Sequence, residues 1–187
     1  MACTDYVFDI KSSQFTVQAF AEGLAGIVDH RPQFSVRDFS GDIEFDPDKP
    51  DGGSLHLSAK TGSLDIMGAV TKRDRQMIER VMFTEVLHPE MFPEAGFRSS
   101  RVVCRQVTEN RYSADIAGTV SLHGKENVQS IEAQLVLSDG SLRAYGAFRL
   151  RQTDFGLTIA SVAGGVLRIK DELKFGFFVV ARKQNGA

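Results

Sequence analysis

Apolar and polar residues alternate along several stretches of the chain. From Tyr112 to Leu122 the even-numbered positions are apolar or glycine, and most odd-numbered positions are polar. This is the period of a β-strand that buries one face. The same alternation runs from Ile131 to Leu137 and, after the pair Asp139-Gly140, from Leu142 to Leu150. Asp-Gly between two alternating runs is typical of a hairpin turn, so the pattern predicts antiparallel strands here.

The last alternating segment differs from the others because both of its faces are apolar. Positions from Leu173 to Ala181 alternate as before, but Phe178 and Val180 add apolar side chains to the second face. We expect this strand to be buried on both sides or to form an interface. Shorter strands are predicted earlier in the chain, at Phe15–Ala19, Phe34–Val36, Ile43–Phe45 and Leu55–Ala59. Together these segments predict about eight or nine strands.

One segment has helical rather than strand spacing. Met77, Ile78, Val81 and Met82 recur at the spacing of one helix face, and Thr71 and Asp74 precede them as a capping box. The spacing predicts a helix over about 73–83. A lone helix between two groups of strands is a crossover or a plug, not a layer of an α/β sheet. With no internal repeat or linker, the sequence predicts one all-β domain over residues 1–187.

The inward faces of the predicted strands leave two architectures open, a packed sandwich or a barrel around a cavity. Small residues are frequent on these faces: Ala114, Gly118, Ala133, Ala144, Gly146 and Ala181. In a barrel such residues leave apolar space that favours an apolar ligand. The alternative is that Phe148, Phe175 and Phe177 fill this space and the core is simply packed.

Composition excludes several classes of protein. The chain has 22 Lys and Arg against 24 Asp and Glu, a net charge of -2, so it lacks the basic excess of most nucleic-acid-binding proteins. The longest apolar runs, such as Phe177–Val180, are far shorter than the roughly 20 residues that span a bilayer. Two cysteines, Cys3 and Cys104, make neither a disulfide framework nor a zinc site. This cysteine usage, together with an N-terminus that lacks the features of a secretory leader, predicts a cytoplasmic location.

Sequence motifs of catalysis are missing from the chain. The four histidines lack the short spacings of a zinc site, and Gly-x-Ser-x-Gly, Walker and His-Glu-x-x-His motifs do not occur. We therefore expect no catalytic residues, no metal and no cofactor.

Six short segments carry a resemblance to a known family. They are Tyr6–Asp9, Phe39–Ile43, Arg73-Asp74, Phe97–Ser99, Leu122–Gly124 and Asp154–Leu157. In this order and spacing the chain resembles the YceI-like family of polyisoprenoid-binding proteins, from about Tyr6 to Lys183. It departs from the family at Ser12-Ser13, where a His-Ser pair is common, and at Phe20–Glu22, where a further His is common.

The resemblance implies an extended eight-stranded antiparallel lipocalin-like barrel with one or two short helices. Its long apolar lumen would bind a polyisoprenoid or a similar amphiphilic lipid of polyprenyl or quinone type. Family members are regarded as carriers or stores of isoprenoids, so the resemblance implies a binding protein, not an enzyme. Many members are exported, which the N-terminus of this chain does not support.

On this basis we expect nine residues to line the ligand-binding lumen. They are Ile116, Gly118, Val120, Leu135, Leu142, Ala144, Phe148, Phe175 and Phe177. If they face inward, Ala144→Phe or Gly118→Phe should block the ligand and leave the barrel folded.

Three polar residues are candidates for contact with the ligand head group: Arg73, Asp74 and His123. Each also has a purely structural interpretation. Asp74 would cap the helix, and Arg73 would pair with it or with a carbonyl. His123 would lie on the polar face of a turn whose positive φ is supplied by Gly124. The head group therefore stays open.

Two functions from different classes follow. The first is a lipid carrier, and the second is a packed barrel that binds no lipid and forms a homodimer through an apolar outer surface such as that of Phe178 and Val180. An enzyme would need a polar cluster inside the lumen, and the sequence places none there.

Overall fold

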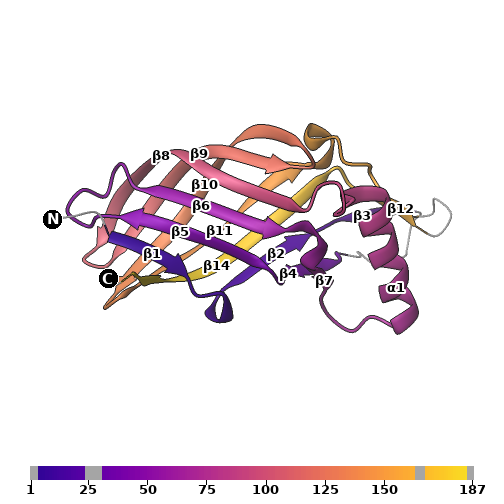
Figure 1. Cartoon of the computed structure of the whole chain (residues 1–187), viewed down its shortest axis with the longest axis horizontal. Coiled ribbons are helices and arrows are strands. Elements are labelled where there is room, and N and C mark those ends of the chain that lie inside the picture. The colour runs from indigo at the N-terminus through magenta and orange to yellow at the C-terminus, as the bar shows by residue number, and fades with distance from the viewer. Residues whose placement is uncertain (1–3, 24–30, 163–166, 185–187) are drawn as a thin grey trace.

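The structure is a computed structural model, and it describes residues 4–23, 31–162 and 167–184. Eleven strands form one antiparallel sheet that closes into an eight-stranded barrel (Figure 1). Closure occurs at β14 (Glu172–Lys183), which pairs with β11 (Ser141–Arg151) on one side and with both β1 (Thr4–Phe8) and β2 (Gln14–Gln18) on the other. The predicted lipocalin-like architecture is confirmed.

The eleven strands occupy eight positions around the barrel, because three of these positions are each formed by two successive strands. The strands β1 and β2 are separated by the 3-10 turn η1 (Ile10–Ser12) but lie along the same edge of β14. In the same way β4 (Gln33–Val36) continues into β5 (Phe39–Phe45), and β6 (Ser54–Lys60) continues through the turn η2 (Thr61–Ser63) into β7 (Leu64–Ile66).

Each of the other five positions in the barrel is occupied by one long strand. They are β8 (Glu94–Thr108), β9 (Arg111–Leu122), β10 (Lys125–Ser138), β11 and β14. Their inward positions are those that the alternation predicted, since Tyr112, Ala114, Ile116 and Val120 are all buried. The hairpin between β10 and β11 turns at Asp139-Gly140, where Gly140 has φ of 70°. A separate three-stranded sheet consists of β3 (Ala21–Gly23), β12 (Ser161–Val162) and β13 (Leu167–Ile169).

The predicted helix is α1 (Lys72–Val81), and it continues as the π-helix η3 (Met82–Leu87). The predicted capping box is confirmed: the backbone N–H of Asp74 donates to Oγ1 of Thr71 at 3.2 Å. Helical structure extends beyond the predicted limit of 83 and ends where His88 takes up a left-handed conformation before Pro89.

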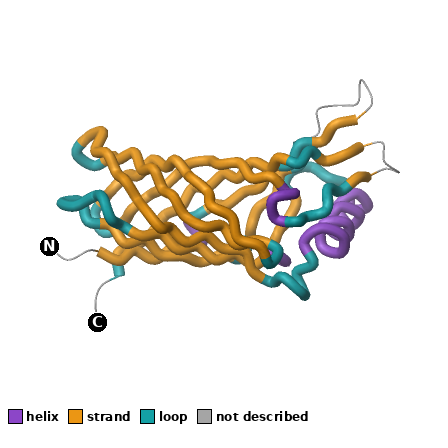
Figure 2. Tube along the Cα trace, turned by 90° about the horizontal axis from the view of Figure 1, so that it is seen from above, coloured by secondary structure: helices purple, strands orange, loops and turns teal. Residues whose placement is uncertain are grey.

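The barrel has two distinct ends, which Figures 1 and 2 show in two views. At the helix end lie α1, η3, the β9–β10 turn and the 3-10 turn η4 (Gln152–Phe155). At the terminal end lie the first and last described residues and the β8–β9 and β10–β11 turns. No helix in the described part of the chain is long and apolar enough to cross a bilayer.

The outer face of β14 exposes less apolar surface than the sequence predicts, because only one of its two outward apolar side chains is exposed. Phe178 is 42% exposed, as expected for an outward side chain, but Val180 is only 9% exposed. The reason is the break between β1 and β2. The backbone N–H of Asp9 and the hydroxyl of Ser13 both hydrogen bond to the backbone of Val180, so the η1 turn lies against it.

Candidate functional site

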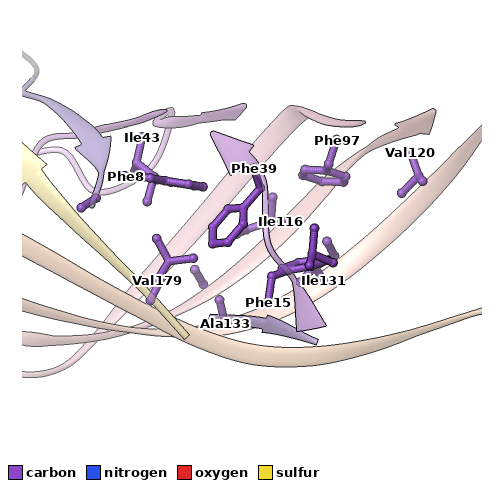
Figure 3. Packing of buried hydrophobic residues seen from close by; sticks show 14 of the residues in the cluster. Phe8, Phe15, Phe39, Ile43, Phe97, Ile116, Val120, Ile131, Ala133 and Val179 are labelled. Carbon is purple, nitrogen blue, oxygen red and sulfur yellow. The ribbon is translucent and has the colours of Figure 1, made fainter. Parts of the chain in front are cut away.

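A narrow apolar cavity lies inside the barrel. It has a volume of about 70 Å³ and 20 lining residues, of which only Glu44 and Ser54 carry strongly polar side chains. Figure 3 shows lining residues from opposite walls, Phe8 on β1 and Ile43 on β5 across from Ile116 on β9 and Ala133 on β10, around the same interior.

Small side chains on three neighbouring strands create this space. Ala114 on β9 lies opposite Ala133 on β10, and Ala144 on β11 lies opposite Leu135. All three alanines are buried and line the cavity. Because larger inward residues would meet the rings from the other wall, this row of alanines keeps a slot open along the lumen.

The terminal end of the lumen is closed by packed side chains. The rings of Phe45 and Tyr112 meet edge to face with their centroids 5.1 Å apart. Leu142 and Ala181, on the adjoining strands, are completely buried. A chain that enters the cavity therefore stops at Phe45 and Tyr112.

Toward the helix end an aromatic cluster bounds the cavity. Phe148 and Phe175 stack with centroids 5.1 Å apart and planes inclined by 9°. The ring centroid of Phe15 lies 6.2 Å from the ring centroids of both Phe175 and Phe39. Phe15 and Phe148 line the cavity, whereas Phe39 and Phe175 lie behind them, so the cluster separates the cavity from the helix end.

The width of the cavity limits what it holds without rearrangement. By the same measure one water molecule needs about 10–15 Å³, so the slot has the room of a few waters. Pockets for drug-sized ligands have volumes of about 300–1,000 Å³. A ligand of several isoprene units must therefore widen the lumen, and the rings of the aromatic cluster are the groups that have to turn.

Five of the nine residues predicted for the lumen line this cavity: Ile116, Leu135, Ala144, Phe148 and Phe177. The other four lie in the core outside it. Leu142 packs at the closed terminal end, and Val120 and Phe175 lie toward the helix end. Gly118 is the fourth.

Gly118 cannot be the open wall position that the sequence suggested. A β-carbon built on Gly118 would lie 2.5 Å from Cζ of Phe97 and would collide with the backbone carbonyl oxygen of Arg98. The ring of Phe97, which is buried (Figure 3), occupies the place of a side chain at 118. The expectation that Gly118→Phe leaves the barrel folded is therefore wrong.

Arg73 and Asp74 lie away from the cavity. Both are exposed at the start of α1, and neither lines the lumen. The Thr71 hydroxyl donates to the carboxylate of Asp74 at 2.7 Å, beside the cap bond from the Asp74 backbone N–H to the same hydroxyl. The geometry thus gives Asp74 a structural role.

His123 lies in a turn, as the structural interpretation expected, but its ring packs against other rings and does not lie on a polar face. It has φ of 53° and is followed by Gly124 with φ of 72°, which makes a tight turn between β9 and β10. Its ring packs 4.1 Å from the ring of Phe92 and 5.8 Å from that of His88, measured between centroids. The sequence did not reveal this, because Phe92 is distant in the chain.

The surroundings of the His123 imidazole favour its neutral form. Its Nε2 atom is buried and has no hydrogen-bond partner. Burial lowers the pKa of His123, the neighbouring His88 lowers it further, and a hydrogen bond with the backbone of Phe155 opposes the shift. His123 therefore offers one unsatisfied polar atom at the helix end of the barrel.

Sequence reasoning missed Cys104 as a wall residue. Its side chain is buried and lines the cavity, and its backbone N–H donates to Oδ1 of Asp51 at 2.8 Å. Burial raises the pKa of the Cys104 thiol to about 11, with smaller contributions from Asp51 and Asp115. The thiol thus stays protonated and acts as a small apolar group.

Ser54 and Glu44 are the polar residues of the cavity lining, and the Ser54 hydroxyl donates to the Glu44 carboxylate at 2.8 Å. In residues 4–23, 31–162 and 167–184, no three His, Cys, Asp or Glu side chains come together in a group that could hold a metal ion. The site is therefore an apolar binding space with very few polar contacts.

Comparisons with known proteins agree with this geometry. A UPF0312 protein of Enterobacter sp. (strain 638) is 28% identical over 130 residues, which are 66% of this chain and 62% of that protein. This chain thus spans less than two thirds of that relative. BcnA of Burkholderia cenocepacia has a TM-score of 0.71 at 18% identity, over 92% of this chain and 98% of BcnA.

A polyisoprenoid binding domain from Saccharophagus degradans, implicated in plant cell wall breakdown, has a TM-score of 0.66 at 11% identity, over 98% of this chain and all of that domain. At such identities these two structures show a common fold. The model of the YceI-like domain matches residues 6–181. Because that match covers nearly the whole chain, the protein belongs to the YceI-like family.

Proposed function

We propose that the protein binds a polyisoprenoid, or a lipid with a similarly long and slender chain, in the barrel lumen. The observation that carries this proposal is the cavity, a slot inside a closed barrel with almost entirely apolar walls. The polyisoprenoid binding domain with the same fold supports the choice of lipid.

Transfer of the chain out of water provides the binding energy. Each buried methylene contributes about 0.8 kcal/mol, so one five-carbon unit contributes a few kcal/mol before the costs of ordering are subtracted. Part of this gain is needed to turn the rings of Phe15, Phe148 and Phe175. A slender chain requires less widening than a fused ring system, so the slot favours linear lipids.

We place the apolar end of the lipid against Phe45 and Tyr112, and its head group toward the helix end. At the terminal end Leu142 and Ala181 are completely buried, and the rings of Phe45 and Tyr112 pack against each other. At the helix end the buried Nε2 of His123 lacks a partner and is suited to accept a hydrogen bond from a hydroxyl group. The remaining predicted wall residues, Gly118, Val120, Leu142 and Phe175, contribute to the core around the chain.

The proposed role is non-catalytic storage or transport of the lipid without a cofactor. The thiol of Cys104, a nucleophile in the cavity wall, is held protonated by burial, which supports this view. A cytoplasmic location, inferred from the sequence, stays a prediction.

The experiment is native mass spectrometry of freshly purified protein, followed by organic extraction and identification of the extracted molecules. We expect a bound species with the mass of an isoprenoid or quinone, in stoichiometric amount. A protein that carries no such species and also takes up no added polyprenol or quinone would contradict the proposal.

A second candidate function is that of an interaction module that forms homodimers. Tyr145 and Phe178 face each other in register on β11 and β14, and their side chains are 43% and 42% exposed. Two exposed aromatic rings side by side are typical of an interface. The native mass reports the oligomeric state, and Phe178→Ser should convert a dimer of this kind into a monomer.

A further inference from the structure

The outward face of α1 is positively charged. Lys72, Arg73 and Arg80 are exposed and, with Gln76, lie on one side of the helix. None of these three cations has an ion-pair partner among the residues that the structure describes. The opposite side of the helix contains Ile78, which packs against the barrel core.

The two acidic residues of α1, Asp74 and Glu79, offset only part of the charge of its four cations. Glu79 lies 3.8 Å from Arg75, whose guanidinium also donates to Asp65. Asp74 takes part in the capping box with Thr71. In a chain with a net charge of -2, three unpaired cations on one helix face form a local positive surface.

An exposed methionine accompanies these cations. Met77, on the flank of the outward face, is 39% exposed. Flexible apolar side chains next to cations are characteristic of helices that lie at the surface of a membrane.

The position of α1 leaves this face accessible. The helix lies past the ends of the long barrel strands, near the short strands β3 and β12 and away from the N- and C-terminal residues (Figures 1 and 2). Its inner face is fixed to the barrel, because Val81 and, in η3, Val86 are both buried. The outer face therefore requires no rearrangement to meet a flat surface.

We propose that the outward face of α1 docks on the surface of an anionic lipid bilayer and brings the helix end of the barrel to the membrane. This inference rests on the proposed function, because a protein that binds a water-insoluble lipid must exchange it with a membrane. The cations complement the negative charge of the phospholipid head groups, and Met77 enters the interface.

The test is flotation of the full chain with vesicles of phosphatidylcholine alone, or of phosphatidylcholine with about 30% phosphatidylglycerol, neither containing an isoprenoid. We expect binding to the anionic vesicles, and release when salt is raised to about 1 M, where screening acts within about 3 Å. Equal binding to neutral and anionic vesicles, or binding to neither, would overturn the proposal.

A pair of matched variants tests the surface itself. Each cation next to an anionic bilayer contributes about fivefold to the affinity, so Lys72→Gln with Arg80→Gln should weaken vesicle binding by about 25-fold. The control is Lys49→Gln with Lys183→Gln, which removes two exposed cations from the terminal end. An equal loss of binding in both double variants would assign the effect to net charge and overturn the role of α1.

Lumen binding is measured separately, with a free isoprenoid alcohol and no vesicles. The α1 double variant should bind this alcohol as the wild type does. Failure to bind vesicles with retained binding of the alcohol overturns the docking surface alone, whereas failure to bind the alcohol overturns the proposed function.

Discussion

The ring of Phe97 on β8 covers Gly118 on β9 and fills the position that a side chain at 118 would need. The same relationship recurs where Phe177 lies over its registered partner Gly146, because a β-carbon there would lie 2.8 Å from Cζ of Phe177. Glycine under an inward aromatic ring lets the ring lie flat on the neighbouring strand. These glycines fit phenylalanine rings into the barrel wall and do not provide space for a ligand.

Replacement of Gly118 should therefore destabilise the barrel. Gly118→Ala places a methyl group against both Phe97 and the backbone of Arg98, and overpacking of this kind costs about 1–3 kcal/mol. The free energy of unfolding in urea measures the effect. Gly176→Ala is the control, because its β-carbon would meet only the Thr16 hydroxyl, at 3.1 Å. Unchanged stability of Gly118→Ala would show that the ring moves aside without cost.

Ala144 is the position at which a larger side chain should block the lumen. Its side chain lines the cavity, so Ala144→Phe fills the slot and should reduce lipid affinity at least tenfold. Ala147→Phe, three residues further along β11 on the exposed face, is the matched control and should bind like the wild type. Circular dichroism verifies that both variants fold. Full affinity of folded Ala144→Phe would contradict the placement of the lipid.

Tyr112 should limit the length of the bound chain. Tyr112→Leu removes the ring that meets Phe45 and lengthens the lumen at its terminal end. In a series of isoprenoid alcohols of increasing length, the variant should bind longer alcohols better than the wild type does. The control is Tyr145→Leu, which changes an exposed tyrosine on the outer face. If Tyr112→Leu and the wild type have the same preference, the chain does not reach Tyr112.

The regular part of this fold could be predicted from the sequence, and the irregular part could not. Alternation located β9, β10 and β11, and Thr71 located the start of α1, because each depends on residues that are close in the chain. The burial of Val180 depends on Ser13, and the packing of the His123 ring depends on Phe92. Such contacts join distant segments, and no periodicity encodes them.

The position of the cavity could likewise not be predicted from the periodicity of the sequence. Alternation places Ile116 and Gly118 on the same face of β9, but only the first lines the cavity. The difference comes from Phe97 on the neighbouring strand, whose ring covers the glycine. The sequence predicted which side chains point inward, but it did not predict which side chain from a neighbouring strand fills the space beside each of them.

His123 should make the stability of the protein depend on pH. Because burial lowers the pKa of His123 below its ordinary value of 6.5, the folded protein binds this proton less readily than the unfolded chain. The contribution of His123 to the free energy of unfolding is complete above about pH 6.5 and is lost as the pH falls from 6.5 through the lower pKa of the folded state.

His123→Asn removes the titrating group and gives Asn-Gly, the pair that tight hairpin turns favour. The urea midpoint of the wild type should thus fall between pH 7.5 and 5.5 by more than that of His123→Asn. Equal decreases in the two proteins would mean that His123 takes up its proton in the folded state as easily as in the unfolded one.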